Sequence, residues 1–219
     1  MTPGRRGQAG GICATVLALA LATTLGGCGA ATSASPTPTG YQWTGLVLVH
    51  PLTKPSFALT DQQGQPFDFR ARTAGKVTLL YFGYTHCPDI CPENMVVLAF
   101  ALKDLPAEVR SRIAVIFVTT DPARDTPPVL GAWLANFNAG FIGLTGTKAE
   151  INLAQFEAAV TQASAGPAQP AGGYGVDHAA QVIAYSADNL AHVAFFQGMP
   201  ASSIARDLDR LVTHPWTGH

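Results

Sequence analysis

Two uninterrupted runs of β-branched and aromatic residues constrain this fold more than any other feature of the sequence. They are Val77–Phe82 (VTLLYF) and Ile113–Thr119 (IAVIFVT). Runs of this kind are typical of strands that are buried on both faces of a parallel or mixed sheet. Between them, Pro92–Leu102 has apolar residues at helical spacing and a proline in its first turn. This order of strand, helix and strand predicts an α/β sheet covered by helices.

The remaining segments extend this pattern within one domain that shows no internal repeat. Polar turn signals predict two hairpins, one N-terminal and one close to the C-terminus. The predicted order is hairpin, then β-α-β-α-β-α, then hairpin, then helix. Asp125-Thr126 is the predicted cap of the second helix. The further strands are Leu46–Val49, Phe57–Leu59, Pro66–Phe69, Gln181–Tyr185 and Ala191–Phe196, and the further helices are Pro127–Phe137, Thr147–Val160 and Pro200–Val212.

The N-terminal residues resemble a bacterial export signal. Arg5 and Arg6 precede Ile12–Leu25, an apolar run of 14 residues, which is shorter than the roughly 20 residues that span a bilayer. Leu25-Gly26-Gly27-Cys28 then resembles a lipobox, whose cysteine is lipidated. The alternative is an ordinary signal peptide that is cut between Ala30 and Ala34.

We therefore expect a signal peptide at 1–27, a flexible tether at 28–40, the folded domain at 41–214 and a tail at 215–219. The tether is rich in Ala, Thr, Ser and Pro, a composition typical of a linker. With Cys28 lipidated, the domain is expected outside the cell, held by its lipid at the outer face of the cytoplasmic membrane.

Composition excludes two classes of protein. Hydrophobic residues make up 47% of the chain and charged residues 12%, so the chain can bury a full core and is not disordered as a whole. The formal net charge is -1, whereas a nucleic-acid binder needs a basic face. We expect no nucleic-acid partner.

Four cysteines are present, but only Cys87 and Cys91 are expected in the folded domain, because Cys13 leaves with the signal and Cys28 carries the lipid. The pair follows a buried strand and lies at the predicted start of a helix, where the helix dipole favours thiolate over thiol. Three interpretations compete: a static disulfide, a redox-active dithiol that forms a disulfide when oxidised, and a metal site.

The number of ligands limits which metal such a site holds. Zinc takes four ligands, or three and a water, and an iron–sulfur cluster takes about four cysteines. Two thiolates and one imidazole suit Cu(I) instead. The imidazole candidate is His178, which follows a glycine-rich loop, with Asp177 as a supporting residue. His86, beside Cys87, is expected to point away from the sulfurs.

Four segments in order resemble the Sco/SenC family: GYTHCPDICP at 83–92, DPARDTP at 121–127, LTGT at 144–147 and YGVDH at 174–178. The resemblance implies a thioredoxin-like fold with a central mixed sheet flanked by helices. It also implies copper bound by Cys87, Cys91 and His178, and a role in assembling the CuA centre of cytochrome c oxidase.

Two features depart from the family pattern or extend it. Ala179-Ala180 follows the histidine, where the family has Ser or Thr. An Ala/Gly/Pro-rich insertion at Ala163–Gly173 predicts a mobile loop before the last hairpin.

Asp121 and Arg124 follow the second buried strand. There they either support the site or dock a partner, or they form only a local ion pair.

The function expected from these residues is that of a copper metallochaperone without turnover, which carries Cu(I) and delivers it to the CuA-bearing oxidase subunit. Whether it also carries Cu(II), and which protein donates the copper, stays open. The alternative is a membrane-anchored thiol:disulfide oxidoreductase, although such enzymes have two residues between their cysteines and this chain has three. A peroxiredoxin is disfavoured, because Thr85 lies only two residues before Cys87. We expect a monomer.

Overall fold

The two buried runs form parallel neighbours in the middle of a sheet. In the computed structural model, which describes residues 40–168 and 173–217, they are β4 (Val77–Gly83) and β5 (Ile113–Thr119), paired from Val77↔Ile113 to Gly83↔Thr119. Every residue of β4 is buried. Alternate side chains point to opposite faces, so Leu79 and Leu80 belong to two different core clusters.

Eight strands make one mixed sheet in the order β1-β10-β9-β4-β5-β6-β2-β3. Only β4–β5 and β5–β6 pair in parallel, and the other neighbours are antiparallel. The predicted N-terminal hairpin is confirmed as β2–β3, and the predicted C-terminal hairpin as β9–β10. Besides β4 and β5, the strands of this sheet are β1 (Leu46–Thr53), β2 (Ala58–Asp61), β3 (Pro66–Asp68), β6 (Ile142–Thr145), β9 (Val182–Tyr185) and β10 (Leu190–Phe195).

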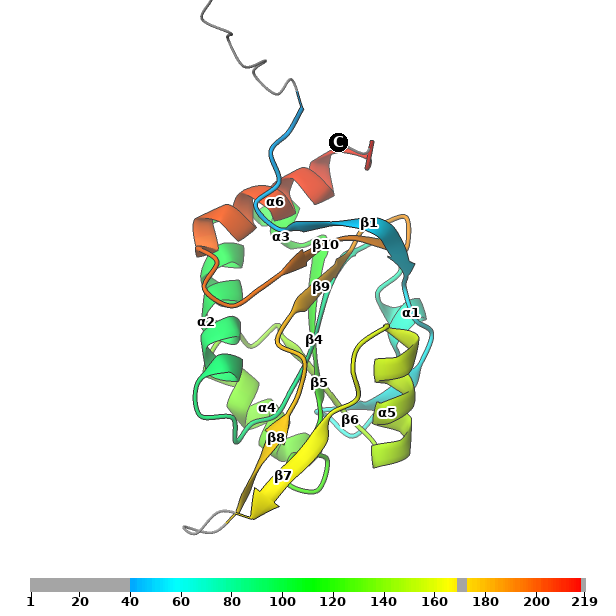
Figure 1. The fold of residues 1–219 in the computed structure, drawn as a ribbon. Coiled ribbons are helices and arrows are strands. Elements are labelled where there is room, and N and C mark those ends of the chain that lie inside the picture. The colour runs from blue at the N-terminus through cyan, green and yellow to red at the C-terminus, as the bar shows by residue number, and fades with distance from the viewer. Residues whose placement is uncertain (1–39, 169–172, 218–219) are drawn as a thin grey trace, which may run out of the picture. The chain divides into compact units, whose positions relative to one another are not determined.

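Helices cover both faces of the sheet (Figure 1). One face packs against α2 (Ile90–Lys103), α3 (Ala107–Arg110), α4 (Pro127–Ala135) and α6 (Ala201–Thr213). The other packs against α1 (Phe69–Arg72) and α5 (Lys148–Glu157). The predicted α/β class and mixed sheet are confirmed. The one-turn helices α1 and α3 were not predicted, and Phe69 begins α1 instead of ending a strand.

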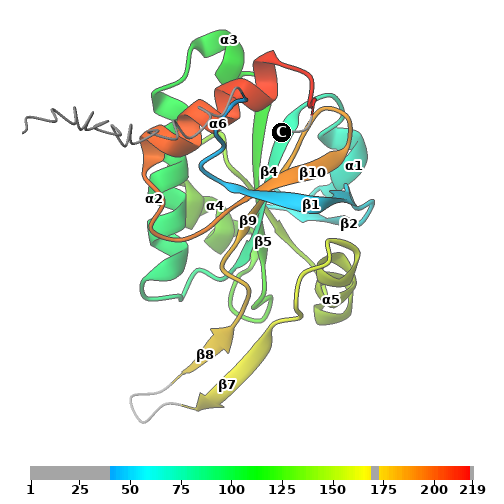
Figure 2. The same ribbon diagram turned by 45° about the horizontal axis from the view of Figure 1, so that its top comes forward.

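The Ala/Gly/Pro-rich insertion differs most from the prediction. Where we expected a mobile loop, β7 (Ser164–Ala168) lies within the insertion and pairs with β8 (Tyr174–Asp177), which follows it, as an antiparallel ribbon. The ribbon projects from the body of the domain (Figure 2). The sequence hides β7 because its residues are small and mostly exposed, so neither alternation nor β-branched side chains mark it. Tyr174 and Val176 of β8 do favour a strand, but they follow a glycine-rich stretch that we expected to be a loop.

The folded part has its own boundaries and core. Residues Pro38–His219 form one compact unit that contains both core clusters, as expected of a domain that folds by itself. Trp216, placed in the predicted tail, packs on Trp43 and stacks on His192 at 4.2 Å between ring centroids. The predicted signal peptide, Cys28 and nearly all of the tether lie outside the described residues. No helix in the described ranges combines the length and the apolarity of a membrane span.

Candidate metal centre

The cysteines lie at the carboxyl end of β4, on the turn that leads into α2. Cys87 precedes the helix and Cys91 lies in its first turn, because the helix begins at Ile90, two residues before the predicted Pro92. The backbone N–H of Cys91 donates to Cys87 Sγ at 3.4 Å. Both cysteines are free; Cys91 is fully buried and Cys87 is 8% exposed. Cys87 is therefore the sulfur that a partner molecule reaches first.

His178 closes the site from the segment that follows the ribbon. Its Nε2 lies 3.4 Å from Cys91 Sγ, and its Nδ1 lies 3.0 Å from the carbonyl oxygen of Ala179. Because a carbonyl can only accept, Nδ1 carries the proton and Nε2 turns a free lone pair toward the sulfurs. Asp177, the predicted supporting residue, is exposed, and the partner of Nδ1 is the Ala179 backbone instead.

The ligand atoms of Cys87, Cys91 and His178 all lie within 4.8 Å of one another. Within the described ranges, no other set of three His, Cys, Asp or Glu side chains converges in this way. His86 is exposed and outside the trio, as expected; its Nδ1 lies 3.0 Å from Thr85 Oγ1. Two sulfurs and one imidazole nitrogen suit a soft metal ion of low coordination number.

Two buried tyrosines contact the ligand side chains. Tyr81, on β4, donates its hydroxyl to Cys91 Sγ at 3.5 Å. The rings of Tyr81 and Tyr84 meet the His178 imidazole edge to face, with centroids 6.1 and 5.6 Å away. They hold the imidazole between them and exclude water from its sides. Burial, the largest cause, raises the pKa of both phenols, so both remain hydrogen-bond donors.

The pKa values of the two cysteines are shifted in opposite directions. A hydrogen bond from the Cys91 side chain, reinforced by the Cys91 backbone N–H, lowers the pKa of Cys87 to about 4. The same contact and burial raise the pKa of Cys91 above its ordinary value. At neutral pH, Cys87 is thus a thiolate and Cys91 a thiol. A metal ion that uses both sulfurs has only the Cys91 proton to displace.

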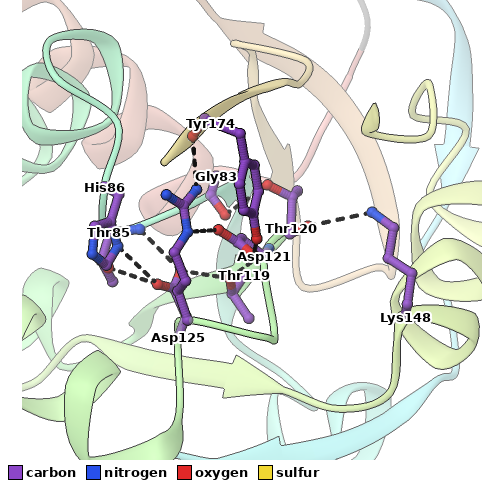
Figure 3. Close-up of polar contacts among 10 residues, drawn as sticks. Gly83, Thr85, His86, Thr119, Thr120, Asp121, Asp125, Lys148 and Tyr174 are labelled. Atoms are coloured by element: carbon purple, nitrogen blue, oxygen red, sulfur yellow. Dashed lines mark hydrogen bonds and ion pairs between the residues drawn. The ribbon is translucent and has the colours of Figure 1, made fainter. Parts of the chain in front are cut away.

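Asp125 fixes the loop before Cys87 and was missed as a site residue. We expected it at a helix cap, but the N-cap of α4 is Thr126, which makes no side-chain capping bond. The buried Asp125 carboxylate accepts instead from the backbone N–H and hydroxyl of Thr85, at 2.9 and 2.6 Å, and from the Thr119 hydroxyl at 2.6 Å (Figure 3). It thereby ties the end of β5 to the turn that carries the first sulfur.

Asp121 and Arg124 hold the ribbon that leads to His178. Arg124 Nε donates to Asp121, and its Nη2 donates to the carbonyl oxygen of Tyr174 at 3.1 Å. The Tyr174 hydroxyl donates to Asp121 at 2.8 Å, and the guanidinium lies 3.9 Å from the Tyr174 ring centroid. We call Asp121, Arg124 and Tyr174 the clasp (Figure 3). The predicted local ion pair therefore exists, and both of its members also bond to Tyr174 on the ribbon.

The chain after His178 is held from the opposite side. Asn94 Nδ2, on α2, donates to the carbonyl oxygen of Ala180 at 3.1 Å. The segment that carries the imidazole is thus fixed at both ends, by α2 and by the clasp. Tyr174 lies within the YGVDH segment, but only the fold brings it together with Asp121.

Comparisons with known proteins agree with this geometry. The chain matches the family model described as SCO1/SenC over residues 49–213. It is 46% identical over 91 residues to the mitochondrial protein SCO2 of Saccharomyces cerevisiae, covering 42% of this chain and 30% of that one. It is 41% identical over 106 residues to a putative copper-binding protein of Stutzerimonas stutzeri, covering 48% and 52%. The matched stretches thus span a third to a half of these two relatives.

A solved structure of Bradyrhizobium japonicum ScoI with copper bound covers 73% of this chain and 99% of its own, at 32% identity and a TM-score of 0.65. This likeness confirms the thioredoxin-like fold that the sequence resemblance implied.

Proposed function

The chain belongs to the SCO1/SenC family, and from this premise we propose that it is a copper metallochaperone that delivers its ion to the CuA site of cytochrome c oxidase. One observation carries the proposal: Cys87, Cys91 and His178 bring their ligand atoms within 4.8 Å of one another. Relatives described as copper-binding or solved with copper bound support the choice of ion.

The donor set favours Cu(I) on chemical grounds. Thiolates are soft ligands that select Cu(I), and two sulfurs with one nitrogen satisfy it without a fourth ligand. Water is excluded from the ion by the buried Cys91 sulfur, by the two tyrosine rings and by the imidazole that they hold. A disulfide between the cysteines would remove two of the three ligands, so copper loading requires the reduced pair.

Delivery follows from how differently the three ligands are held. Cys91 is fixed within α2, whereas His178 follows a projecting ribbon and Cys87 has the more exposed sulfur. An acceptor thiolate approaches at Cys87, the imidazole leaves once the clasp opens and releases the ribbon, and the copper ion passes between sulfurs without becoming uncoordinated. The ion's charge is unchanged throughout, and the Cys91 thiolate takes up its proton again after release.

The site of action belongs to the same proposal. We infer that the domain works outside the cell, anchored by a lipid on Cys28 to the cytoplasmic membrane. The charged N-terminal pair, the apolar run Ile12–Leu25 and the lipobox-like Leu25–Cys28 support this location. CuA lies in the oxidase subunit that we propose as the partner.

The test replaces the gene in cells with His178→Ala, Cys87→Ser and, as matched control, His86→Ala, and measures oxidase activity and CuA content at equal chaperone abundance. We expect both ligand variants to lose CuA and His86→Ala to keep it. If His178→Ala retained CuA while Cys87→Ser lost it, the activity would be thiol reduction and not copper delivery.

A further inference from the structure

An apolar hollow opens on the outer surface between α2 and the end of α4, away from the metal ligands. Its volume is about 390 Å3, and Val96, Phe100 and Phe137 form its apolar lining. Val96 is 40% and Phe100 55% exposed, one helical turn apart on α2. Lys103 and Arg110 also line it, and no carboxylate does. We call this the basic hollow.

A second apolar patch lies on α5, and its charges are of the opposite sign. Leu153 is 54% and Phe156 73% exposed, three residues apart and therefore adjacent on the helix surface. Glu150 and Glu157 lie three residues before and four after Leu153, on the same ridge. We call these four residues the acidic ridge. Large apolar side chains that cluster on a surface mark contact sites more often than single ones do.

We propose that a second copy of this chain covers the basic hollow, with the acidic ridge of one molecule seated in the hollow of the next. Phe156 and Leu153 then enter the apolar space, while Glu157 meets Lys103 and Arg110 at its edge. The Glu150 carboxylate, which caps its own helix at Thr147, adds negative charge beside them. The match in both polarity and charge favours this occupant. Without Arg5 and Arg6, the Pro38–His219 domain has 11 Lys and Arg against 14 Asp and Glu, a formal net charge of -3. A charge of this size leaves only modest long-range repulsion between copies.

The position of the two surfaces sets the kind of assembly. The helix α2 packs on one face of the sheet and α5 on the other, as Figure 1 shows. The contact therefore joins unlike surfaces, so that each molecule keeps one free hollow and one free ridge. Such a heterologous contact adds further copies and does not stop at a symmetric dimer. This differs from the monomer expected from the sequence.

The experiment is sedimentation velocity on the reduced Pro38–His219 domain over a concentration series. We expect the wild type to grow into larger species with concentration. Phe100→Asp disables the hollow and Phe156→Asp the ridge, and each is expected to weaken association at least about tenfold. The control, Val49→Asp, changes an apolar side chain that is 84% exposed on β1 and should associate like the wild type.

Mixing the two variants distinguishes a heterologous contact from any other. Phe100→Asp keeps its ridge and Phe156→Asp keeps its hollow, so an equimolar mixture should form a 1:1 dimer that grows no further. Lys103→Glu combined with Glu157→Lys in one chain should associate more strongly than either change alone. Equal circular dichroism spectra establish that the variants fold. A wild type that stays monomeric throughout, or a mixture that forms no dimer, would overturn the proposal.

Discussion

Gly83 lies where β4 passes directly beneath the Cys91 sulfur. A Cβ at this position would lie 2.7 Å from Cys91 Sγ, closer than such atoms approach, and 3.0 Å from the Phe117 ring, a contact tighter than ordinary van der Waals distance. The glycine thus lets the strand and the first turn of α2 come together, and the site depends on its missing side chain. Neither neighbour can move freely, because both are fully buried.

Gly83→Ala is expected to displace the Cys91 sulfur and to destabilise the domain by about 1–3 kcal/mol, with weaker copper binding. Urea unfolding and a copper competition titration measure the two effects. The matched control is Gly131→Ala on α4, where the nearest atoms lie 3.6 Å from the added carbon; it should be neutral or slightly stabilising. Wild-type copper affinity in Gly83→Ala would contradict this account of the site.

The lowered pKa of Cys87 makes the stability of the reduced, metal-free domain depend on pH. Between about 4 and its ordinary value of 9.0, Cys87 is a thiolate when folded and a thiol when unfolded. The unfolded state then binds more protons, so this contribution to stability grows as pH rises through the window and is lost as pH falls through about 4. Above 9.0, the raised pKa of Cys91 acts in the opposite direction.

Urea unfolding of the reduced domain at several pH values tests this dependence. Stability relative to Cys87→Ser should rise from acid toward neutral pH. A constant difference between the two proteins across the window would show that Cys87 is protonated in the folded state.

At the scale of elements, the ribbon and its clasp decide how firmly the third ligand is held. Tyr174→Phe removes the 2.8 Å hydrogen bond to Asp121 and leaves the ring beside Arg124. We expect copper to dissociate about tenfold faster, measured by transfer to a chelator, with a stability loss of only about 1 kcal/mol. Tyr41→Phe, which also removes a tyrosine–aspartate bond of 2.8 Å, is the control that should leave dissociation unchanged. Equal rates in all three proteins would exclude a role for the clasp.

Local patterns in the sequence predicted the elements that they encode directly. The buried runs of β4 and β5, the hairpin turns and the long helices were found because their periodicity or turn residues are local. The one-turn helices α1 and α3 are too short to show a period, and the small residues of β7 lack β propensity. Likewise, the ligand trio was found from short segments and a resemblance. The partners of Asp125 and Tyr174 come from distant strands, so only the fold reveals them.

At the scale of the whole molecule, a second polar anchor closes the domain at the end opposite the ribbon (Figure 1). Asp207, on α6, is fully buried. It accepts from the Tyr41 hydroxyl at 2.8 Å and from the backbone N–H groups of Thr44 and Gly45 at 2.9 and 2.8 Å. This carboxylate joins the N-terminal segment to the last helix. The sequence gives no sign of it, because a carboxylate on a helix is ordinarily exposed.

Asp207→Asn is expected to lower the free energy of unfolding by about 2–3 kcal/mol, since an amide nitrogen cannot accept these bonds. Copper affinity should remain that of the wild type, because the metal ligands lie elsewhere in the fold. Asp209→Asn on the same helix is the matched control for stability. Loss of copper binding in a folded Asp207→Asn domain would mean that the two ends of the molecule are coupled.

We expect Cys87, Cys91 and His178 to bind one copper ion together. Copper X-ray absorption on the reduced domain, loaded without oxygen, tests it most directly when wild type and His178→Ala are compared at measured stoichiometry. The account predicts one copper with two sulfur neighbours and one nitrogen neighbour, and loss of that nitrogen in the variant. A wild type that binds no stoichiometric copper, or a nitrogen that persists without His178, would contradict it.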